Sequence, residues 1–517
     1  MRKNLLALSI AAMIGGVSGM ANASVFPSNK AVDGADTAVT TDDLAAAANT
    51  ATALVPTVSG VGHILTIPYF STQGGNATLL NITNTDVTNG KAVKLRFRGA
   101  ANSDDIFDIT IFLSPGDVWS AAVSASGELS ALNTNDTSCT LPSIADIKAQ
   151  GGLFKTGRVN PTNSNAETRE GYVEILNTAD IPAGSALFTA IKHVNGKAPC
   201  TASVMDAQAA DLKAGDAVNN PRTRGYSWPT GGLYANWILV NTTDKASFSG
   251  EAVAVRADTT ATSGVSGSGN LVSFPQTTDA PDYTTSTTGV SGFTADPLLQ
   301  SAGFAGQVAN YDFPDLSTPY TSNLTVSATG TATQATNLAN ALATKSVVND
   351  FLVGGGASFT TDWVFSMPTR RYAVAVDYAA KGLVFNSGAA AAGANPAVPG
   401  VNTHFTSANT SLNASTLQAC VTPGGAMKGY SREEDTQSTF VISPDTALKL
   451  CGETSVLTFG SEKVLKASIA ARTVPVNYAE GWLTVGLGNG LPVIGYAATK
   501  AAGATNLGGT WMHRTSK

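Results

Sequence analysis

Side chains that could do acid–base or nucleophilic chemistry are few in this chain and widely spaced. The four histidines stand singly, at positions His63, His193, His404 and His513. A zinc site or a Ser-His-Asp triad would therefore have to assemble from distant segments, and isolated surface or strand-edge histidines are the favoured interpretation. The patterns G-x-S-x-G, H-E-x-x-H, G-x-x-x-x-G-K-[ST] and C-x-x-C-H are absent from the sequence.

Carboxylates give no catalytic signal either. Glu433, Glu434 and Asp435 follow Arg432, and a charge run of this kind is usually a solvated loop. A glycosidase needs only two carboxylates on separate strands, so the sequence leaves that alternative open without supporting it. We therefore predict a protein that is not an enzyme and that needs no cofactor, with calcium as the one ligand to be weighed.

The calcium candidates lie in one Asp-rich segment. Asn102-Ser-Asp104-Asp105-x-x-Asp108 places several hard oxygen atoms within a few residues, beside a turn that carries Asp117. Ca²⁺ takes about six to eight oxygen ligands, and loops at the ends of sandwiches can supply them. The spacing is not that of an EF-hand, so plain turn chemistry is the favoured interpretation and Asp104, Asp105 and Asp108 are the candidate calcium ligands.

Four cysteines, two in each half of the chain, predict disulfides in an oxidising compartment. The preferred pairing is Cys139–Cys200 and Cys420–Cys451, because each bridge closes a loop within one proposed domain. The two other connectivities stay formally open. Metal binding is the alternative, but these separations of 61 and 31 residues contain no C-x-x-C knuckle.

The elements that would position these side chains are short strands. Runs of β-branched and aromatic residues, separated by Gly, Pro, Asn and Asp, continue along most of the chain. Val93-Lys-Leu-Arg-Phe-Arg98 alternates apolar and basic residues, which predicts a half-buried strand. Three short helices are expected, at residues 142–150, 201–213 and 333–348.

A weak internal repeat supports a hairpin-rich fold. Its copies begin at Leu80, Ile175 and Leu239, and each predicts a strand, an Asn-Thr exit, a polar loop, then Gly and a second strand that ends in a cation. The second strands are expected at residues 92–96, 186–192 and 252–256. Such hairpins predict an all-β fold of two antiparallel β-sandwich, jelly-roll-like domains with a few short helices.

The chain divides into five predicted segments. A basic start, a short apolar core and Ala21-Asn22-Ala23 indicate a signal peptide. No later segment has the run of about eighteen apolar residues that a membrane helix needs. The segments are the signal peptide (1–23), a flexible or clasping N-terminal arm (24–59), a first sandwich (60–256), a Thr/Ser/Gly-rich acidic linker or insertion (257–345) and a second sandwich (346–517).

The composition describes a polar but weakly charged surface. Only 13% of the residues are charged, about half of the usual share. Without Arg2 and Lys3 of the signal peptide, 29 cationic side chains stand against 37 carboxylates, a formal charge of −8. This balance argues against nucleic acid as a partner, because phosphate binding needs a clustered cationic face. It suits an extracellular layer that packs against copies of itself, or an ordinary secreted domain with a neutral surface.

Several stretches resemble a family of proteobacterial cell-surface proteins that are surface-layer-like. They are Ile67–Asn76, Ala100–Asp108, Leu113–Trp119, Thr361–Tyr372, Gly481–Leu483 and Leu491–Tyr496. The likeness spans most of the mature chain, and its motifs are structural rather than catalytic. It implies a β-rich protein on a Gram-negative cell surface, forming a paracrystalline coat held by self-contacts and by outer-membrane lipopolysaccharide. It implies no active-site residues.

These observations support an ordered set of functions. The leading hypothesis is a structural cell-surface protein that self-assembles into a surface layer or a similar extracellular coat, as a homo-oligomer or lattice. The alternative is a secreted adhesin or carbohydrate-binding protein, with Trp228, Tyr234 and Trp237 as sugar platforms unless these aromatics are core. An extracellular filament subunit is a further alternative, and a secreted hydrolase comes last.

Overall fold

The computed structural model describes residues 24–26, 28, 44–157, 159–210, 212, 216–273, 337–355, 358–378, 380–385, 404–438, 440, 448–501 and 507–517. The predicted signal peptide, much of the predicted arm and most of the predicted linker lie outside these residues.

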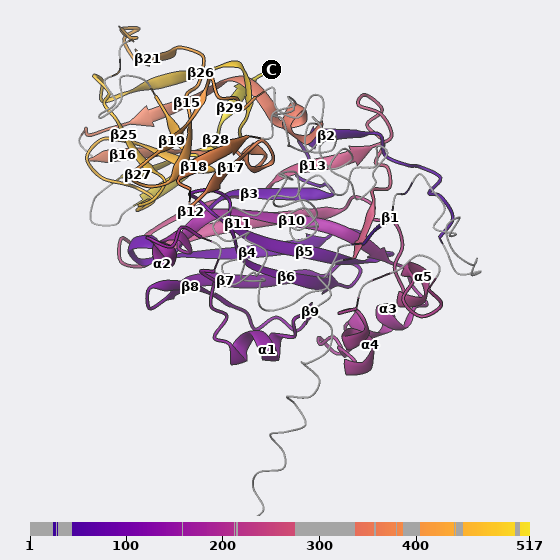
Figure 1. Cartoon of the computed structure of the whole chain (residues 1–517). Helices are drawn as coiled ribbons and strands as arrows, with labels where there is room; N and C mark the ends of the chain where they lie inside the picture. The colour runs from indigo at the N-terminus through magenta and orange to yellow at the C-terminus, as the bar shows by residue number, and fades with distance from the viewer. Residues whose placement is uncertain are drawn as a thin grey trace, which may run out of the picture.

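Antiparallel β-sheet makes up nearly all of the regular structure in the described residues, and every helix there is short. The prediction of an all-β fold built from sandwiches with a few short helices is confirmed. In Figure 1 the orange to yellow strands of the second half lie beside the indigo to magenta sheets of the first half. The predicted domain boundaries remain a prediction.

Two sheets form the first sandwich. The larger has seven strands, in the order β2 (Ala53–Thr57), β13 (Val253–Asp258), β3 (Ile64–Ser71), β10 (Glu170–Ile181), β5 (Gly90–Gly99), β6 (Asp105–Leu113) and β9 (Cys139–Leu141). The smaller has five, in the order β12 (Ala246–Glu251), β11 (Leu233–Asn241), β4 (Asn76–Asn84), β7 (Val118–Ser126) and β8 (Leu129–Asn133). In the described part of the predicted arm, β2 is an edge strand of the larger sheet and pairs with β13, whereas β1 (Ser24–Phe26) pairs with β14 (Leu271–Ser273) in a separate two-stranded sheet.

The second half is built in the same way. One five-stranded sheet has the order β22 (Thr436–Gln437), β21 (Met427–Ser431), β26 (Glu480–Pro492), β15 (Ala343–Leu352) and β29 (Arg514–Ser516). The other has the order β25 (Ala471–Val474), β24 (Thr454–Phe459), β16 (Phe359–Ser366), β27 (Tyr496–Ala501) and β28 (Leu507–Met512). Two small sheets accompany them, formed by β17 (Val374–Asp377) with β18 (Gly382–Phe385), and by β19 (Thr410–Asn413), β20 (Gln418–Val421) and β23 (Leu450–Cys451).

Each of the three predicted helices is present, and the two later ones are shorter than predicted. Helix α1 (Ile144–Ala149) lies inside the predicted 142–150, whereas α4 (Ala202–Ala207) is shorter than the predicted 201–213. Residues 337–342 are helical, but β15 begins at Ala343, so a helix through Val348 is wrong. The segment is a strand because β15 pairs with β26 along its length. Alternate side chains of β15, such as Val347 and Phe351, are buried. The other short helices are α2 (Ser164–Glu167), α3 (Ala186–Ile191), α5 (Pro221–Arg224), η1 (Gln73–Gly75) and η3 (Arg370–Tyr372). None of the described helices has the length and apolar character needed to cross a membrane.

The three repeat copies do not form three equivalent hairpins. In the first copy, β4 and β5 belong to different sheets, so the chain crosses between the layers. In the second copy, the prediction of a strand at residues 186–192 is wrong, because this segment forms helix α3. The Ser185 hydroxyl caps the start of this helix by accepting a hydrogen bond from the Phe188 N–H. In the third, β11 pairs with β12, and the predicted strand 252–256 is β13 of the larger sheet. Local turn chemistry predicts where a strand ends and leaves open which sheet receives the next one.

Strand β5 is buried on both faces. Its alternation predicts a half-buried strand, which is wrong. Leu95 and Phe97 pack in the core between the two sheets, whereas Arg96 and Arg98 on the opposite face are also buried. The physical reason is that protein, rather than water, covers this opposite face: Arg371 and its neighbours in the second half cover the end with Arg96 and Arg98, and α3, α4 and Trp228 cover the end with Ala92.

One apolar core runs through both halves. It contains Leu95 and Trp237 of the first sandwich together with Val364, Val456 and Tyr496 of the second half. The rings of Trp237 and Tyr496 lie 4.7 Å apart between centroids. A second core cluster lies between the two sheets of the second half. The halves are therefore joined by continuous packing as well as by polar contacts.

Both predicted disulfides are confirmed. Cys139 pairs with Cys200 across 61 residues, and Cys420 pairs with Cys451 across 31 residues. The first bridge joins β9 to the segment before α4, and the second joins directly opposite residues of β20 and β23. They indicate an oxidising compartment outside the cytoplasm.

Removal of the first disulfide should destabilise the protein. A Cys139→Ala/Cys200→Ala double variant is expected to lose about 2–5 kcal/mol of unfolding free energy, because the unfolded chain regains the freedom of a long loop. Urea unfolding with and without reductant measures this. Reductant should cost the variant less than it costs the unmodified protein, and equal losses in both would contradict the assignment.

Candidate functional site

The buried histidines are neutral structural groups. His63 is fully buried, with Nε2 3.0 Å from the Gly267 carbonyl and Nδ1 accepting a hydrogen bond from the Ala257 N–H. Burial lowers the pKa of His63 to about 3, and the charges of Lys91 and Arg256 act in the same direction. His513 is partly buried, and desolvation of its ring lowers its pKa to about 3. Its Nε2 lies 2.9 Å from the Val364 carbonyl and its Nδ1 lies 3.0 Å from the Asn349 amide, so both ring nitrogens have partners within the fold.

One site brings an acid, an imidazole and a hydroxyl together. His193 Nδ1 lies 3.4 Å from an Asp117 carboxylate oxygen, and its Nε2 lies 3.3 Å from the Thr137 hydroxyl. Both distances exceed the usual hydrogen-bond reach of a catalytic pair, about 2.6–3.2 Å. The Thr137 hydroxyl donates to the Gly196 carbonyl, and Asp117 also accepts from the Ser114 N–H and the Ser138 hydroxyl. The cluster holds a turn together. The spacing of these residues along the chain does not predict that they meet.

The three calcium candidates have protein partners. Asp104 is buried and accepts a hydrogen bond from the Tyr378 hydroxyl, Asp105 forms an ion pair with Arg96 at 3.3 Å, and Asp108 pairs with Lys94. Across the described parts of the chain, no three His, Cys, Asp or Glu side chains gather as ligands of a metal ion would. Calcium at this segment stays a prediction of the sequence.

The Asp-rich segment docks the second half instead. The Asn102 amide donates to the Leu417 carbonyl at 2.7 Å and accepts from the Ala419 N–H at 3.1 Å. The Asn102 side chain therefore forms hydrogen bonds with the backbone of β20 and of the residue before β20, as the backbone of a neighbouring strand would. The Thr454 N–H donates to the Ala100 carbonyl at 3.1 Å in the same region.

A buried ion cluster lies where the halves meet. We call it the Glu174 cluster: its carboxylate lies 3.7 Å from Arg96, 3.3 Å from Arg98 and 3.4 Å from Arg371. Next to it, Arg370 and Glu453 form an ion pair at 2.7 Å. Burial raises the pKa of Glu453, and the two arginines oppose that rise. Arginine is suited to such a site because its planar fork can satisfy several carboxylate oxygens at once.

Glu170 makes a second buried contact between the halves. Its carboxylate accepts from the Tyr69 hydroxyl at 2.8 Å and from the Ser468 N–H at 3.0 Å. Burial raises the pKa of Glu170, and these hydrogen bonds oppose the rise. Each group in this contact is used for hydrogen bonding inside the fold, which leaves it no free atom for a substrate.

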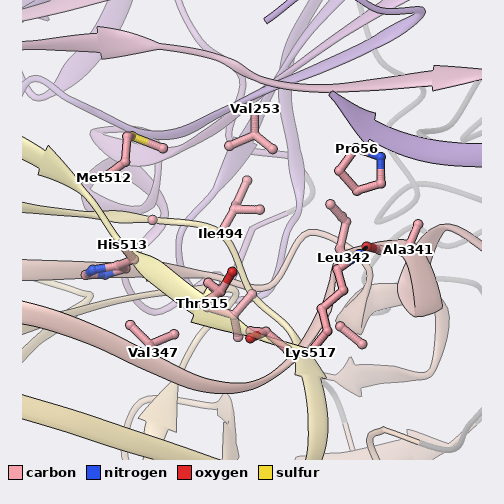
Figure 2. Close-up of a pocket in the computed structure, with 14 residues that line it drawn as sticks. Pro56, Val253, Ala341, Leu342, Val347, Ile494, Met512, His513, Thr515 and Lys517 are labelled. Atoms are coloured by element: carbon pink, nitrogen blue, oxygen red, sulfur yellow. Dashed lines mark hydrogen bonds between the residues drawn. The ribbon is translucent and has the colours of Figure 1, made fainter. Parts of the chain in front are cut away.

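An apolar cavity lies between the two halves (Figure 2). Its volume is about 180 Å³, and it is lined by residues such as Pro56, Val253, Leu342 and Ile494. Figure 2 shows the His513 ring pointing away from the middle of the cavity. The Lys517 ammonium, which also lines it, donates to the Ala341 carbonyl. The cavity offers apolar contact and a little polar chemistry at its rim.

The predicted sugar platforms are not on the surface as a group. Trp237 is fully buried, Trp228 is 7% exposed, and Tyr234 is half-buried. The alternative that these aromatics are core is confirmed for both tryptophans. The exposed tryptophans are Trp482 and Trp511, at 40% and 45%. The sequence contained a signal for Trp482, because Leu483 and Val485 mark the inward face of β26 and the residue before them must face outward.

The outer face of the smaller sheet of the first sandwich is nearly free of charge. We call it the β4 face. Leu79 and Ile238 are directly opposite each other on β4 and β11, and both are more than a third exposed. Among the outward residues of this sheet, Glu251 at the end of edge strand β12 is the charged one. The outward residues without charge are Ser247, Ser249, Tyr234, Asn236, Ile238, Val240, Ala77, Leu79, Asn81, Thr83, Val118, Ser120, Ala122, Ser124, Ser126, Leu129, Ala131 and Asn133.

A hollow lies at one side of the β4 face. Its volume is about 530 Å³, and it lies between the strands and the end of α1, where Lys148, Gly151 and Gly152 form its wall. Asn81 and Ser120 lie in its floor, and the Ser120 hydroxyl donates to the Asn81 amide oxygen at 2.8 Å. The hollow gives this flat face a shape that a protruding element of another molecule could enter.

Comparison with protein-family models, with curated proteins and with solved structures finds no match to this chain. The likeness to surface-layer-like proteins therefore stays an expectation from the sequence.

The pKa of His63 predicts a pH dependence of stability. Its folded-state pKa is about 3, below the unfolded value of about 6.5. The unfolded chain therefore binds a proton that the folded chain does not, so this contribution to stability is complete above about pH 6.5 and is lost as the pH falls towards 3. In a His63→Gln variant, unfolding free energy measured by urea between pH 4 and 6 should vary less steeply, by about 1.4 kcal/mol per pH unit. His404→Gln controls for loss of a histidine, and an unchanged slope in His63→Gln would refute the assignment.

The Glu174 cluster should be essential for stability. Glu174→Gln removes one charge from among three buried arginines, and breaking a buried ion pair in this way costs about 3–5 kcal/mol. Urea unfolding at neutral pH measures the loss. Arg432→Gln is the matched control, because the Arg432 side chain is 72% exposed and such pairs contribute about 1 kcal/mol or less. Similar small losses in both variants would show that the cluster does not hold the halves together.

Proposed function

We propose that the protein is a structural subunit that assembles with copies of itself into an extracellular coat. The observation that carries the proposal is the β4 face, which is broad, has Leu79 and Ile238 near its middle and carries one charged outward residue, Glu251, at its edge. An exposed apolar centre rimmed by polar side chains is typical of a protein–protein contact surface.

Charge explains why this face suits a second copy. Without the predicted signal peptide the chain has a formal net charge of −8, so two copies repel each other over most approaches, and the repulsion weakens where the facing surfaces carry little charge. Asn and Ser side chains on the face can donate and accept hydrogen bonds across an interface without the cost of burying ions.

The size of the face favours a repeating contact over an isolated dimer. Five strands about 4.8 Å apart, each presenting about seven residues of about 3.3 Å, give about 550 Å² per molecule. A stable pair usually buries about 800 Å² on each partner. A contact of this size is weak alone and becomes durable when each subunit makes several, as in a layer or filament.

The location follows from the compartment. The two disulfides indicate an oxidising environment, and the predicted signal peptide provides an export route. We propose that the coat lies on the cell surface. Attachment to outer-membrane lipopolysaccharide is supported by the resemblance of the sequence alone.

Assembly tests the proposal. Sedimentation and negative-stain electron microscopy of the purified mature protein should show a lattice or filament, which also separates the layer from the filament alternative. A Leu79→Glu/Ile238→Glu variant should stay dispersed under the same conditions, because the added carboxylates repel between copies.

Val218→Glu is the matched control, since Val218 is exposed but lies outside the β4 face. It should assemble like the unmodified protein, and all three proteins should show the same thermal unfolding midpoint. Assembly of the double variant, or no ordered assembly by the unmodified protein at any concentration, would refute the proposal.

A further inference from the structure

Two exposed tryptophans line one hollow in the second half of the molecule. The hollow has a volume of about 350 Å³, and its lining includes Trp482 of β26, Trp511 of β28 and Asp350 of β15. We call it the tryptophan cleft. It belongs to the two sheets of the second half, whereas the β4 face belongs to the first sandwich.

Trp482 is held in a fixed orientation. Its ring stacks on Tyr430 with centroids 4.1 Å apart and planes at 14°, and these residues are directly opposite on β26 and β21. Asp350 is opposite Trp482 on the other side, on β15. The indole therefore keeps its orientation without a ligand, and 40% of the residue is still exposed. A platform fixed in this way loses little side-chain entropy on binding.

Trp511 is positioned by a glycine. A Cβ atom at Gly509, two residues earlier on the same strand, would lie 3.0 Å from the Trp511 ring. The indole lies back against the bare backbone of β28, which limits how it can rotate. Both tryptophans are thus supported by their own sheets rather than by each other.

Polar groups surround the two rings. The Arg432 guanidinium and the Glu480 carboxylate form an ion pair at 2.8 Å and line the cleft together with Asp350. Thr499 also lines the cleft, and its hydroxyl lies 3.0 Å from that of Thr361. Carboxylate and guanidinium groups are strong partners for hydroxyl groups, because one member of each hydrogen bond is charged.

We infer that the tryptophan cleft binds a neutral glycan. A pyranose ring has an apolar face of C–H groups that packs on an indole, and a rim of hydroxyls that need hydrogen-bond partners. The cleft supplies both. Its two tryptophan rings are held in fixed orientations, and charged hydrogen-bond donors and acceptors line the same hollow. Ligand sites generally combine apolar surface with a few placed polar groups in this way.

The charge of the cleft selects the class of glycan. Two carboxylates, Asp350 and Glu480, face one cation, Arg432. The cleft is therefore net negative, which disfavours acidic polysaccharides through like-charge repulsion. Neutral hydroxyl-bearing sugars meet no such cost.

Affinity electrophoresis tests the inference. The mature protein is run in native gels that contain dextran, laminarin, galactomannan or hydroxyethyl cellulose as neutral polysaccharides, with alginate as the acidic comparison. At least one neutral polysaccharide should retard the protein and alginate should not. Trp482→Ala and Trp511→Ala should each reduce the affinity at least tenfold, and Asp350→Asn should weaken it less.

Met512→Ala is the matched control, because Met512 neighbours Trp511 on β28 with nearly the same exposure but lines the cavity of Figure 2 instead of the cleft. Retardation of Met512→Ala should equal that of the unmodified protein, and circular dichroism should be the same for all variants. The inference is overturned if no neutral polysaccharide retards the protein, or if the tryptophan variants bind as well as the control. It is also overturned if they lose self-assembly while glycan binding is unchanged, which would make the cleft a contact between copies.

Discussion

The contact between Glu174 and three arginines, Arg96, Arg98 and Arg371, constrains the rest of the structure. All of these side chains are removed from water, and a buried charge is tolerated only when oppositely charged groups and hydrogen bonds surround it. The second half of the chain must therefore lie where Arg371 completes the cluster. A displacement of a few ångströms would leave charges unpaired in a low-dielectric layer, so the cluster selects one arrangement of the two halves.

That arrangement determines which surfaces remain for function. The polar face of the larger sheet is used for docking the second half, with Asn102 bonding to Leu417 and Ala419 and with Glu170 bonding to the backbone at residue 468. The smaller sheet of the first sandwich keeps its outer face open, and the second half presents the tryptophan cleft. Two different surfaces are thus available, one flat and nearly free of charge, the other small, aromatic and rimmed by charge. A coat subunit that both packs with its neighbours and holds a glycan would need this separation.

Several sequence patterns led to correct predictions because they depend on local physics. Alternation and turn residues predicted strands, and the cysteine positions predicted Cys139–Cys200 and Cys420–Cys451. Other patterns failed where a distant segment decided the outcome. Arg96 and Arg98 alternate with apolar residues as they would on a wet surface, yet the second half covers them. Trp237 is of a residue type that often binds sugars, but its ring packs against Tyr496, which is more than two hundred residues away in the sequence. The region 186–192 had strand-like spacing, and the Ser185 cap together with packing made it a helix.

The sequence by itself determined the β-rich class, the expectation of disulfides and the low charge of the surface, because strand period and turn chemistry are properties of neighbouring residues, and cysteine number and charge are properties of the overall composition. The structure then decided among the possible cysteine pairings. Only the tertiary structure decided that Asp104, Asp105 and Asp108 find partners within the protein, that Leu79 and Ile238 lie side by side, and that Trp482 and Trp511 share one hollow. Burial and neighbourhood depend on which sheets pack together. That choice is made by contacts between residues far apart in the chain, and a pattern within one segment does not contain it.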